Sequence, residues 1–134
     1  MKPDFSLLLV VLTALTGLIW LQNADCFEQE TWENALIDAR NLREGSYFGN
    51  LCGLQDGSVQ GDWRLPNVKE LQSLFDYGQY NPALPPGHPF TVSLSYGYWS
   101  STTLDYLPAN AWFESLYDGS VWWRFKGEHW WVWP

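Results

Sequence analysis

The chain reads Gly61-Asp62-Trp63-Arg64-Leu65-Pro66-Asn67-Val68-Lys69-Glu70-Leu71 where a helix is expected to begin. Glycine and aspartate favour a turn, and Pro66 fixes a backbone dihedral that suits the entry to a helix. Asn67 is followed three residues later by Glu70, which is the spacing of a capping box. We therefore predict a short helix that ends near Tyr77-Gly78, with an apolar stripe formed by Val68, Leu71, Leu74 and Phe75.

A longer helix is expected upstream, over residues 31–44, with Thr31 as its N-cap. Charged residues occupy one side of this helix, and apolar side chains recur on the other at spacings of three and four. The apolar residues are Trp32, Ala35, Leu36, Ala39 and Leu42. Residues 45–61 contain several glycines and read as a long polar loop. Residues 81–90 hold four prolines, so they form a shaped surface connection and not a helix interior or a central strand.

The second half of the chain has the pattern of β-strands, over residues 96–103, 110–117, 120–126 and 129–133. Asp118-Gly119 is typical of a tight hairpin turn, and a second hairpin is expected to turn around Gly127. Helices followed by an antiparallel meander predict an α+β fold in which two helices pack on a twisted sheet.

A two-residue Asp118-Gly119 loop would divide the strand side chains between the two faces of the sheet. The expected core face carries Trp112, Glu114, Leu116, Val121, Trp123 and Phe125. The opposite face carries Phe113, Ser115, Tyr117, Trp122, Arg124 and Lys126, and a two-residue turn at Gly127-Glu128 would add His129, Trp131 and Trp133.

The second face is aromatic and locally basic, which suits a glycan or protein ligand because flat rings can contact the apolar C–H faces of sugars. The candidate ligand-binding residues are Tyr117, Trp122, Arg124, Lys126 and Trp131. An alternative interpretation is a cation-π ladder of Trp122, Arg124 and Trp131 that only stiffens the sheet. A one-residue slip at Gly127 would replace Trp131 by Trp130 on this face.

Size and charge restrict the function. The 134 residues suffice for one domain, and aromatic residues (18%) outnumber charged ones (16%). A net charge of -8 argues against nucleic acid as a partner, because phosphate recognition relies on many lysines and arginines.

The N-terminus has the layout of a secretory signal, with Lys2 followed by an uncharged Leu/Val-rich run from Phe5 to Trp20. We expect residues 1–15 to be an apolar leader, with cleavage near Ala14, and residues 16–134 to be the mature domain without a membrane span. The expected location is secreted, periplasmic or on the cell surface.

Cys26 and Cys52 are the only cysteines, and an even number in an exported chain predicts one disulfide. Two buried free thiols are the alternative. No metal is expected, because two cysteines with the distant His88 and His129 lack the spacing of zinc ligands.

The stretch 61–71, together with Asn81-Pro82-Ala83-Leu84-Pro85, Tyr98-Trp99-Ser100-Ser101-Thr102-Thr103 and Trp131-Val132-Trp133-Pro134, resembles the Lcl C-terminal domain family. This is a bacterial domain of unknown function named after a collagen-like adhesin. The resemblance extends over residues 16–134 and implies a fold similar to C-type lectin domains. Residues 16–26 resemble the first core strand of the family. Members usually carry more sequence before residue 16 and after the final Trp-Pro, so a truncated copy is a further expectation.

The resemblance also bears on catalysis and on calcium. Arg64-Leu65-Pro66 with Glu70 is similar to a structural segment of formylglycine-generating enzymes, but their late cysteine pair is absent here, and we expect no enzyme and no cofactor. Calcium-dependent lectins suggest an oxygen site, for which Asp56, Asp62, Asn67 and Asp105 are the candidates. The tripeptides that bind sugar in those lectins are missing, and Asp56 and Asp62 are typical of turns beside Gly57 and Gly61.

The sequence thus favours a non-enzymatic recognition module, for which glycans bound at the aromatic sheet face are the expected ligands. The alternative function is a protein-binding display scaffold of the diversified lectin-like type. Arg64 could anchor a ligand, but an arginine at a helix entry more often pairs with a local carboxylate or carbonyl.

Overall fold

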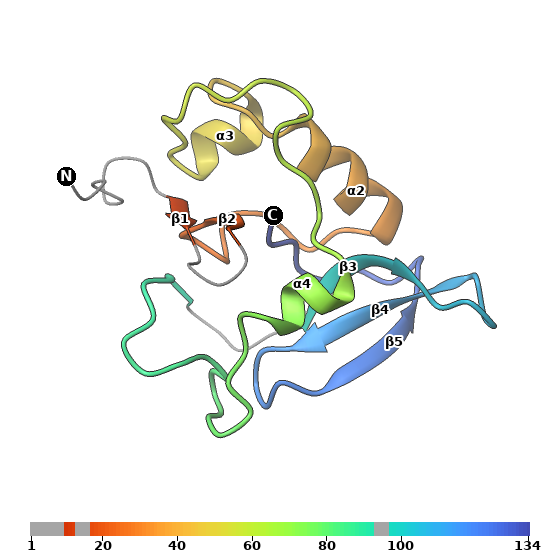
Figure 1. The fold of residues 1–134 in the computed structure, drawn as a ribbon. Coiled ribbons are helices and arrows are strands. Elements are labelled where there is room, and N and C mark those ends of the chain that lie inside the picture. The colour runs from red at the N-terminus through yellow and green to blue at the C-terminus, as the bar shows by residue number, and fades with distance from the viewer. Residues whose placement is uncertain (1–9, 13–16, 93–96) are drawn as a thin grey trace.

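The computed structural model describes residues 10–12, 17–92 and 97–134. Along these residues lie β1 (Val10–Leu12), β2 (Ile19–Leu21), α2 (Trp32–Asn41), α3 (Tyr47–Leu51), α4 (Val68–Gln72), β3 (Gly97–Thr103), β4 (Asn110–Ser115) and β5 (Val121–Phe125). In Figure 1, α2 and α3 lie on one side of the molecule and the β3-β4-β5 sheet on the other, with α4 against the sheet. The predicted α+β class is confirmed.

The two predicted helices are present and begin where their caps were expected. Both end earlier than predicted: α2 ends at Asn41 and not at residue 44, and α4 ends at Gln72 and not near Tyr77-Gly78. The Thr31 hydroxyl accepts from the Asn34 N–H at the start of α2. Ala35 and Ala39 are the buried residues of α2, and their small side chains suit close packing. A third helix, α3, lies inside the stretch predicted to be only a loop; it begins after Ser46, whose hydroxyl accepts from the Gly49 N–H. The sequence pattern did not indicate this helix, because its five residues are too few to show a period.

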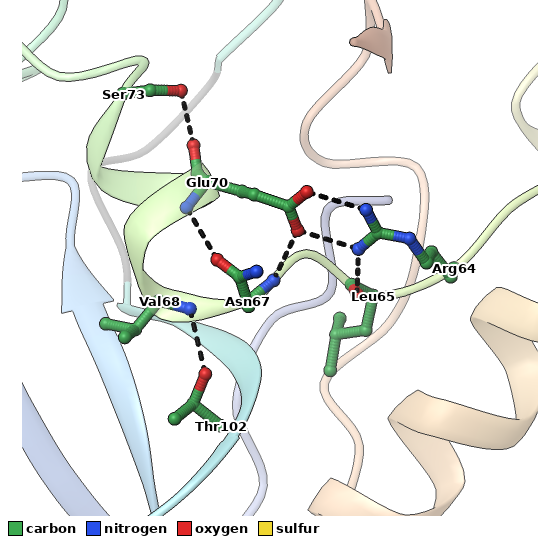
Figure 2. A network of polar contacts seen from close by, with 7 residues as sticks. All are labelled: Arg64, Leu65, Asn67, Val68, Glu70, Ser73 and Thr102. Atoms are coloured by element: carbon green, nitrogen blue, oxygen red, sulfur yellow. Dashed lines mark hydrogen bonds and ion pairs between the residues drawn. The ribbon is translucent and has the colours of Figure 1, made fainter. Parts of the chain in front are cut away.

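The start of α4 is the capping box that the sequence predicted. The Asn67 side chain accepts from the Glu70 N–H (2.8 Å), and the Glu70 carboxylate accepts from the Asn67 N–H (2.9 Å). Figure 2 shows that the same carboxylate also accepts hydrogen bonds from both terminal nitrogens of Arg64. The two N···O distances are 2.7 and 2.6 Å. Arg64 also donates to the Leu65 carbonyl oxygen, so the prediction of a local structural partner for this arginine is confirmed. The Val68 N–H donates to the Thr102 hydroxyl and thereby connects α4 to β3.

The sheet is antiparallel and has the order β3-β4-β5. Phe113 lies opposite Trp122 and Ala111 lies opposite Arg124. The two-residue loop predicted at Asp118-Gly119 is wrong, because the last pair is Ser115 with Ser120 and residues 116–119 form the loop. The shift relative to the predicted register is an even number of residues, so the two predicted sets of β4 and β5 side chains keep their faces.

The C-terminal segment does not continue the meander as predicted. Trp130 pairs with Glu30 in an antiparallel bridge, and Trp131 pairs with Tyr98 in a parallel bridge on the side of β3 away from β4. The predicted hairpin at Gly127-Glu128 is therefore wrong. The reason is that β3 offers a buried edge at which the apolar end of the chain loses more water-exposed surface than it would beside β5.

The core lies between the sheet, α2 and the C-terminal segment. Trp20, Tyr98 and Phe90 surround Trp133, which is fully buried and donates from its indole N–H to the Leu21 carbonyl oxygen. The Leu21 N–H in turn donates to the Pro134 carbonyl oxygen, so the C-terminus lies beside β2 (Figure 1). Trp133 is therefore a core residue and not part of the predicted ligand face.

The face of the sheet predicted to be the core is buried on β4 but not on β5. Glu114 and Leu116 are fully buried, but Trp123 is 42% exposed and Phe125 is 58% exposed. The helix α4 packs on β3 and β4, while β5 is the edge strand of the sheet. The outer strand therefore keeps aromatic side chains in contact with solvent on both faces.

A disulfide joins Cys26 to Cys52, as predicted. It connects the segment after β2 to the end of α3, where Cys52 is the C-cap. Most of the leader expected at residues 1–15 lies outside the described residues; within it, Val10–Leu12 pair with Ile19–Leu21. Whether the leader is cleaved stays a prediction. In the described part of the chain, no helix is long and apolar enough to cross a membrane.

Candidate functional site

Arg124 is at the centre of the predicted ligand face. Its guanidinium lies over the rings of Phe113 and Trp130, with distances to the ring centroids of 5.3 and 5.7 Å. The two rings contact each other with centroids 5.0 Å apart. Phe113 is buried, and Trp130 is held by its backbone bridge to Glu30, so both rings are fixed beneath the cation.

Gly97 explains how the Phe113 ring reaches this position. A Cβ added at Gly97 would overlap the Phe113 ring and would also approach Trp130. Only glycine leaves room for the Phe113 ring to lie across β3. Gly97 of β3 therefore allows the ring from β4 to lie beneath the Arg124 guanidinium of β5.

Lys126 is placed by a second aromatic contact. Its ammonium lies 4.0 Å from the centroid of the Trp32 ring and donates to the Thr103 hydroxyl at 3.0 Å. The Trp32 N–H donates to the Lys126 carbonyl oxygen, and its indole N–H donates to the Ser100 carbonyl oxygen. The ring is thereby held by both its backbone and its side chain. We call Trp32, Phe113, Trp122, Arg124, Lys126 and Trp130 the aromatic-cation face.

Trp122 is the exposed ring of this face. It lies opposite Phe113 in the sheet, is 49% exposed, and donates from its indole N–H to the Ser120 hydroxyl at 2.6 Å. The hydrogen bond fixes the ring while leaving much of it open to solvent. Trp122 and Arg124 are two residues apart on one strand, so they share the face.

The remaining predicted site residues lie elsewhere. Tyr117 is half exposed in the β4-β5 loop and contacts Tyr80 edge to face, with centroids 6.4 Å apart. Trp131 does not join Arg124; Trp130 takes that position, as the one-residue slip would require, and the inclusion of Trp131 is corrected accordingly. The sequence pattern placed Phe113 on this face but not among the candidate binding residues, and it offered Trp130 only through a one-residue slip. Trp32 was not predicted to lie there, because its contact with Lys126 joins segments far apart in the sequence.

The cation-π contacts predicted by the alternative interpretation are present, but with different partners. Arg124 lies over Phe113 and Trp130 and not between Trp122 and Trp131.

Glu114 is a buried carboxyl on the opposite face of β4. It is fully buried, and neither carboxyl oxygen has a hydrogen-bond partner. Burial alone raises the pKa of Glu114 to about 8, so the group is mostly protonated at neutral pH. The pKa of the nearby Tyr77 is also raised, first by burial and then by the charge of Glu114.

Glu30 is a second carboxyl with a raised pKa. Burial, followed by a hydrogen bond with Asp38 and by the charges of Asp38 and Glu28, raises the pKa of Glu30 to about 8. The backbone carbonyl oxygen of Glu30 accepts from the Trp99 indole N–H and from the Trp130 N–H, so the backbone at Glu30 holds Trp130 in place.

Two of the calcium candidates, Asp56 and Asp62, have local structural partners. Asp56 accepts from the N–H and the hydroxyl of Ser58, and Asp62 accepts from the Val59 N–H, as predicted for turn residues. Within the residues that the structure describes, no group of three or more His, Cys, Asp or Glu side chains is arranged to hold a metal ion.

Comparison with known proteins gives one family. The family model described as the Lcl C-terminal domain matches residues 9–134, which includes the stretch 61–71 and the C-terminal Trp-rich segment. No curated protein and no solved structure matches the chain. Since the match covers nearly all of the sequence, the chain belongs to the Lcl C-terminal domain family.

Proposed function

We propose that the chain is a non-catalytic recognition module that binds glycans through the aromatic-cation face. The observation that carries this proposal is the arrangement of Arg124, whose guanidinium lies over two fixed rings beside the half-exposed Trp122. A sugar presents an apolar C–H face and a polar edge, and this arrangement offers a ring for the first and hydrogen-bond donors for the second. The lectin-like fold implied by the family resemblance belongs to the same proposal.

Anionic glycans are the particular ligand class that the charges favour. Arg124 and Lys126 lie over aromatic rings. In the part of the chain that the structure describes, the ion pair is formed by Arg64 with Glu70, and neither Arg124 nor Lys126 takes part in it. Their charges are thus not neutralised by a carboxylate contact. The chain as a whole carries a net charge of -8 and repels anions at long range, so binding depends on short-range contacts at this face.

The absence of catalysis is part of the proposal. Glu30 and Glu114 have the raised pKa values that often mark catalytic acids, but neither is among the residues that line the two cavities found in the described part of the chain. Burial in the core accounts for the raised pKa of Glu114 without any reaction. We therefore expect these carboxyls to affect the pH dependence of stability and not to catalyse a reaction.

We also propose an extracytoplasmic location. The disulfide between Cys26 and Cys52 suits an oxidising compartment. The apolar run near the N-terminus suits export. Expression with the leader, followed by mass determination of the chain in the periplasm and the medium, tests this directly: intact protein confined to the cytoplasm would contradict it.

Glycan binding is tested by array screening of the folded, disulfide-bonded chain at low and moderate salt, with calcium and with chelator. The Trp122→Ala and Arg124→Gln variants should lose binding, and wild-type binding to anionic glycans should weaken as salt rises. Trp123→Ala is the matched control, because it removes an exposed indole from the same strand on the opposite face. Equal loss in Trp123→Ala, or no glycan bound by a folded sample, would refute the proposed function.

A protein ligand is the second candidate function, and one observation favours it. Several tyrosines are more than half exposed, including Tyr77, Tyr80 and Tyr117 around the β4-β5 loop. Tyrosine supplies large contact area with little loss of side-chain entropy and is enriched in protein-binding surfaces. Loss of a captured protein partner in Tyr80→Ser, with glycan binding absent in the wild type, would select this function.

A further inference from the structure

The strand β5 leaves one edge of the sheet unpaired. β5 is the last strand in the order β3-β4-β5, and Figure 1 shows it at the outer side of the sheet. The opposite edge is covered, because Trp131 pairs with Tyr98 on the side of β3 away from β4. Among the described residues, no segment forms a ladder or a bridge with the outer side of β5. Such an edge presents backbone N–H and C=O groups that can pair with another chain.

The ladder with β4 determines which backbone groups of β5 point outward. The Lys126 N–H donates to the Ala109 carbonyl oxygen, and the Ser115 N–H donates to the Ser120 carbonyl oxygen. Hydrogen-bonded and non-hydrogen-bonded pairs alternate in an antiparallel ladder, so residues 122 and 124 direct their backbone groups toward β4. The N–H and C=O groups of residues 121, 123 and 125 therefore point to the open edge.

The turn after β5 closes part of this edge. The Phe125 N–H donates to the Glu128 carboxylate at 3.1 Å, and the Glu128 N–H donates to the Phe125 carbonyl oxygen at 2.9 Å. Both outward groups of Phe125 are thus used within the chain. In the part of the chain that the structure describes, no hydrogen bond engages the outward N–H and C=O groups of Val121 and Trp123. The open part of the edge therefore consists of these four groups.

The four groups are complementary to the same four groups of a second copy. When two β5 strands pair antiparallel around a two-fold axis at Trp122, Val121 of each copy lies opposite Trp123 of the other. Each of these pairs exchanges two hydrogen bonds, so every open group of both copies is satisfied. An axis at Val121 or at Trp123 satisfies fewer groups, because the next residues to pair would be Gly119 and Phe125, whose N–H groups already have acceptors.

Side chains on both faces of β5 gain contacts from this pairing. Trp122 lies opposite Trp122 of the second copy in a non-hydrogen-bonded pair, where cross-strand side chains are closest. On the other face, Trp123 lies opposite Val121. In the single chain Trp122 is 49% exposed and Trp123 is 42% exposed. Both indoles therefore have apolar surface to bury against a second copy.

The charges along β5 are complementary to their own reverse. Asp118 lies at one end of the row, where its carboxylate accepts from the hydroxyl and the N–H of Ser120. These hydrogen bonds, the hydroxyl first, lower the pKa of Asp118, so it is charged at neutral pH. Arg124 and Lys126 lie at the other end of the row. An antiparallel pair centred on Trp122 brings the acidic end of each copy toward the basic end of the other, which favours a second copy over an unrelated strand.

We propose that two copies of the chain pair through β5 and form a dimer with one continuous antiparallel sheet. Because Trp131 covers the other edge of this sheet, the pairing closes at two copies and does not continue into a fibre. The two aromatic-cation faces lie on the same side of the joined sheet, since Trp122 of both copies points to one face. The dimer does not depend on glycan binding, because its contacts are made between the two β5 strands.

Sedimentation equilibrium of the disulfide-bonded chain, from about 1 µM to about 1 mM, measures the association. The chain has a mass of 15.5 kDa, and we expect a reversible change to twice that mass. Because only a short segment pairs, the dissociation constant should be on the order of 10–100 µM. A monomer at every concentration, or an assembly larger than a dimer, would overturn the proposal.

Two substitutions of the same kind test the position of the interface. Trp123→Lys places a charge in the paired segment and should weaken the dimer by about tenfold or more. Phe125→Lys is the matched control. Phe125 is 58% exposed on the same face of the same strand, but Glu128 engages its backbone groups, so the dimer should stay within about twofold of the wild type. Equal weakening in both variants, or weakening in neither, contradicts the proposed interface.

Cysteine substitutions test the register. In Trp122→Cys the two sulfur atoms should lie close enough across the two-fold axis to form a disulfide between the copies. Arg124→Cys, on the same face, is the control, because its partner in this register is Ser120 and not a second cysteine. Mild oxidation should cross-link Trp122→Cys and leave Arg124→Cys mainly as a single chain on a non-reducing gel. Cross-linking of both to the same extent, of Arg124→Cys alone, or of neither contradicts the register.

Failure of the dimer and failure of glycan binding can be told apart, because association is measured without a ligand. A dimer that binds no glycan would refute the proposed function alone. A monomer that binds glycans through Trp122 and Arg124 would overturn the dimer alone.

Discussion

Replacing Glu114 by glutamine should stabilise the protein, and the gain should grow with pH. The carboxyl is fully buried, has no hydrogen-bond partner, and has a pKa of about 8 in the folded state against an ordinary value of 4.5. Since the folded state binds the proton more tightly than the unfolded state, this group contributes no penalty below pH 4.5. Stability is then lost as pH rises from 4.5 to about 8, and the loss levels off above that value.

The size of the effect follows from the same two pKa values. One pKa unit corresponds to about 1.4 kcal/mol, so the full penalty above pH 8 is about 5 kcal/mol, of which about 3 kcal/mol is already present at pH 7. Small domains have a total stability of about 5–15 kcal/mol, so this one carboxyl would consume a large part of it. Glutamine has nearly the same shape and does not ionise.

The assay is urea unfolding followed by tryptophan fluorescence, at pH 4.5 and at neutral and mildly alkaline pH, with the disulfide intact. Glu114→Gln should exceed the wild type by about 3 kcal/mol at pH 7 and by no more than about 1 kcal/mol at pH 4.5. Glu44→Gln, at an exposed position, is the control and should stay within about 0.5 kcal/mol of the wild type. A difference between Glu114→Gln and the wild type that does not change with pH would refute the reasoning.

Three further perturbations have expected results. Replacing Cys26 and Cys52 by alanine opens a loop with a sequence separation of 26 and should lower the free energy of unfolding by about 3–4 kcal/mol, measured by urea unfolding. Gly97→Ala should displace the Phe113 ring and cost about 1–3 kcal/mol, and an unchanged melting temperature would contradict the close contact. Asn67→Ala should cost about 1 kcal/mol, because α4 loses its N-cap, whereas Asn67→Asp should retain most of the stability in the same thermal melt.

Local signals in the sequence were sufficient for the starts of α2 and α4 and for the division of the β4 and β5 side chains between the two faces of the sheet. The capping box of Asn67 and Glu70 needs only neighbouring residues, so the start of α4 was predictable. The side chains on each face of β4 and β5 were predicted correctly although the length of the hairpin loop was not. The predicted and observed registers differ by an even number of residues, which leaves each side chain on its face. The disulfide was predictable because only one pairing exists.

Features that depend on distant segments were not predictable. The position of Trp131 depends on whether the last residues pair with β5 or with β3, and the two choices have similar local patterns. The exposure of Trp123 depends on how far the helices extend over the sheet, which no pattern within β5 reports. The contact of Lys126 with Trp32 joins two segments far apart in the sequence, so it could be found only once they were placed together.

The distribution of charge connects these observations to function. Arg124 and Lys126 lie over aromatic rings on the edge of the sheet, where a ligand can approach them without displacing a carboxylate. Arg64 has the opposite arrangement, since Glu70 occupies two of its donors. An acidic chain can thus offer a locally basic surface to a ligand. Because salt screens interactions between charges and has little effect on an uncharged ligand, ionic strength should weaken the binding of an anionic glycan at the aromatic-cation face far more than the binding of a neutral one.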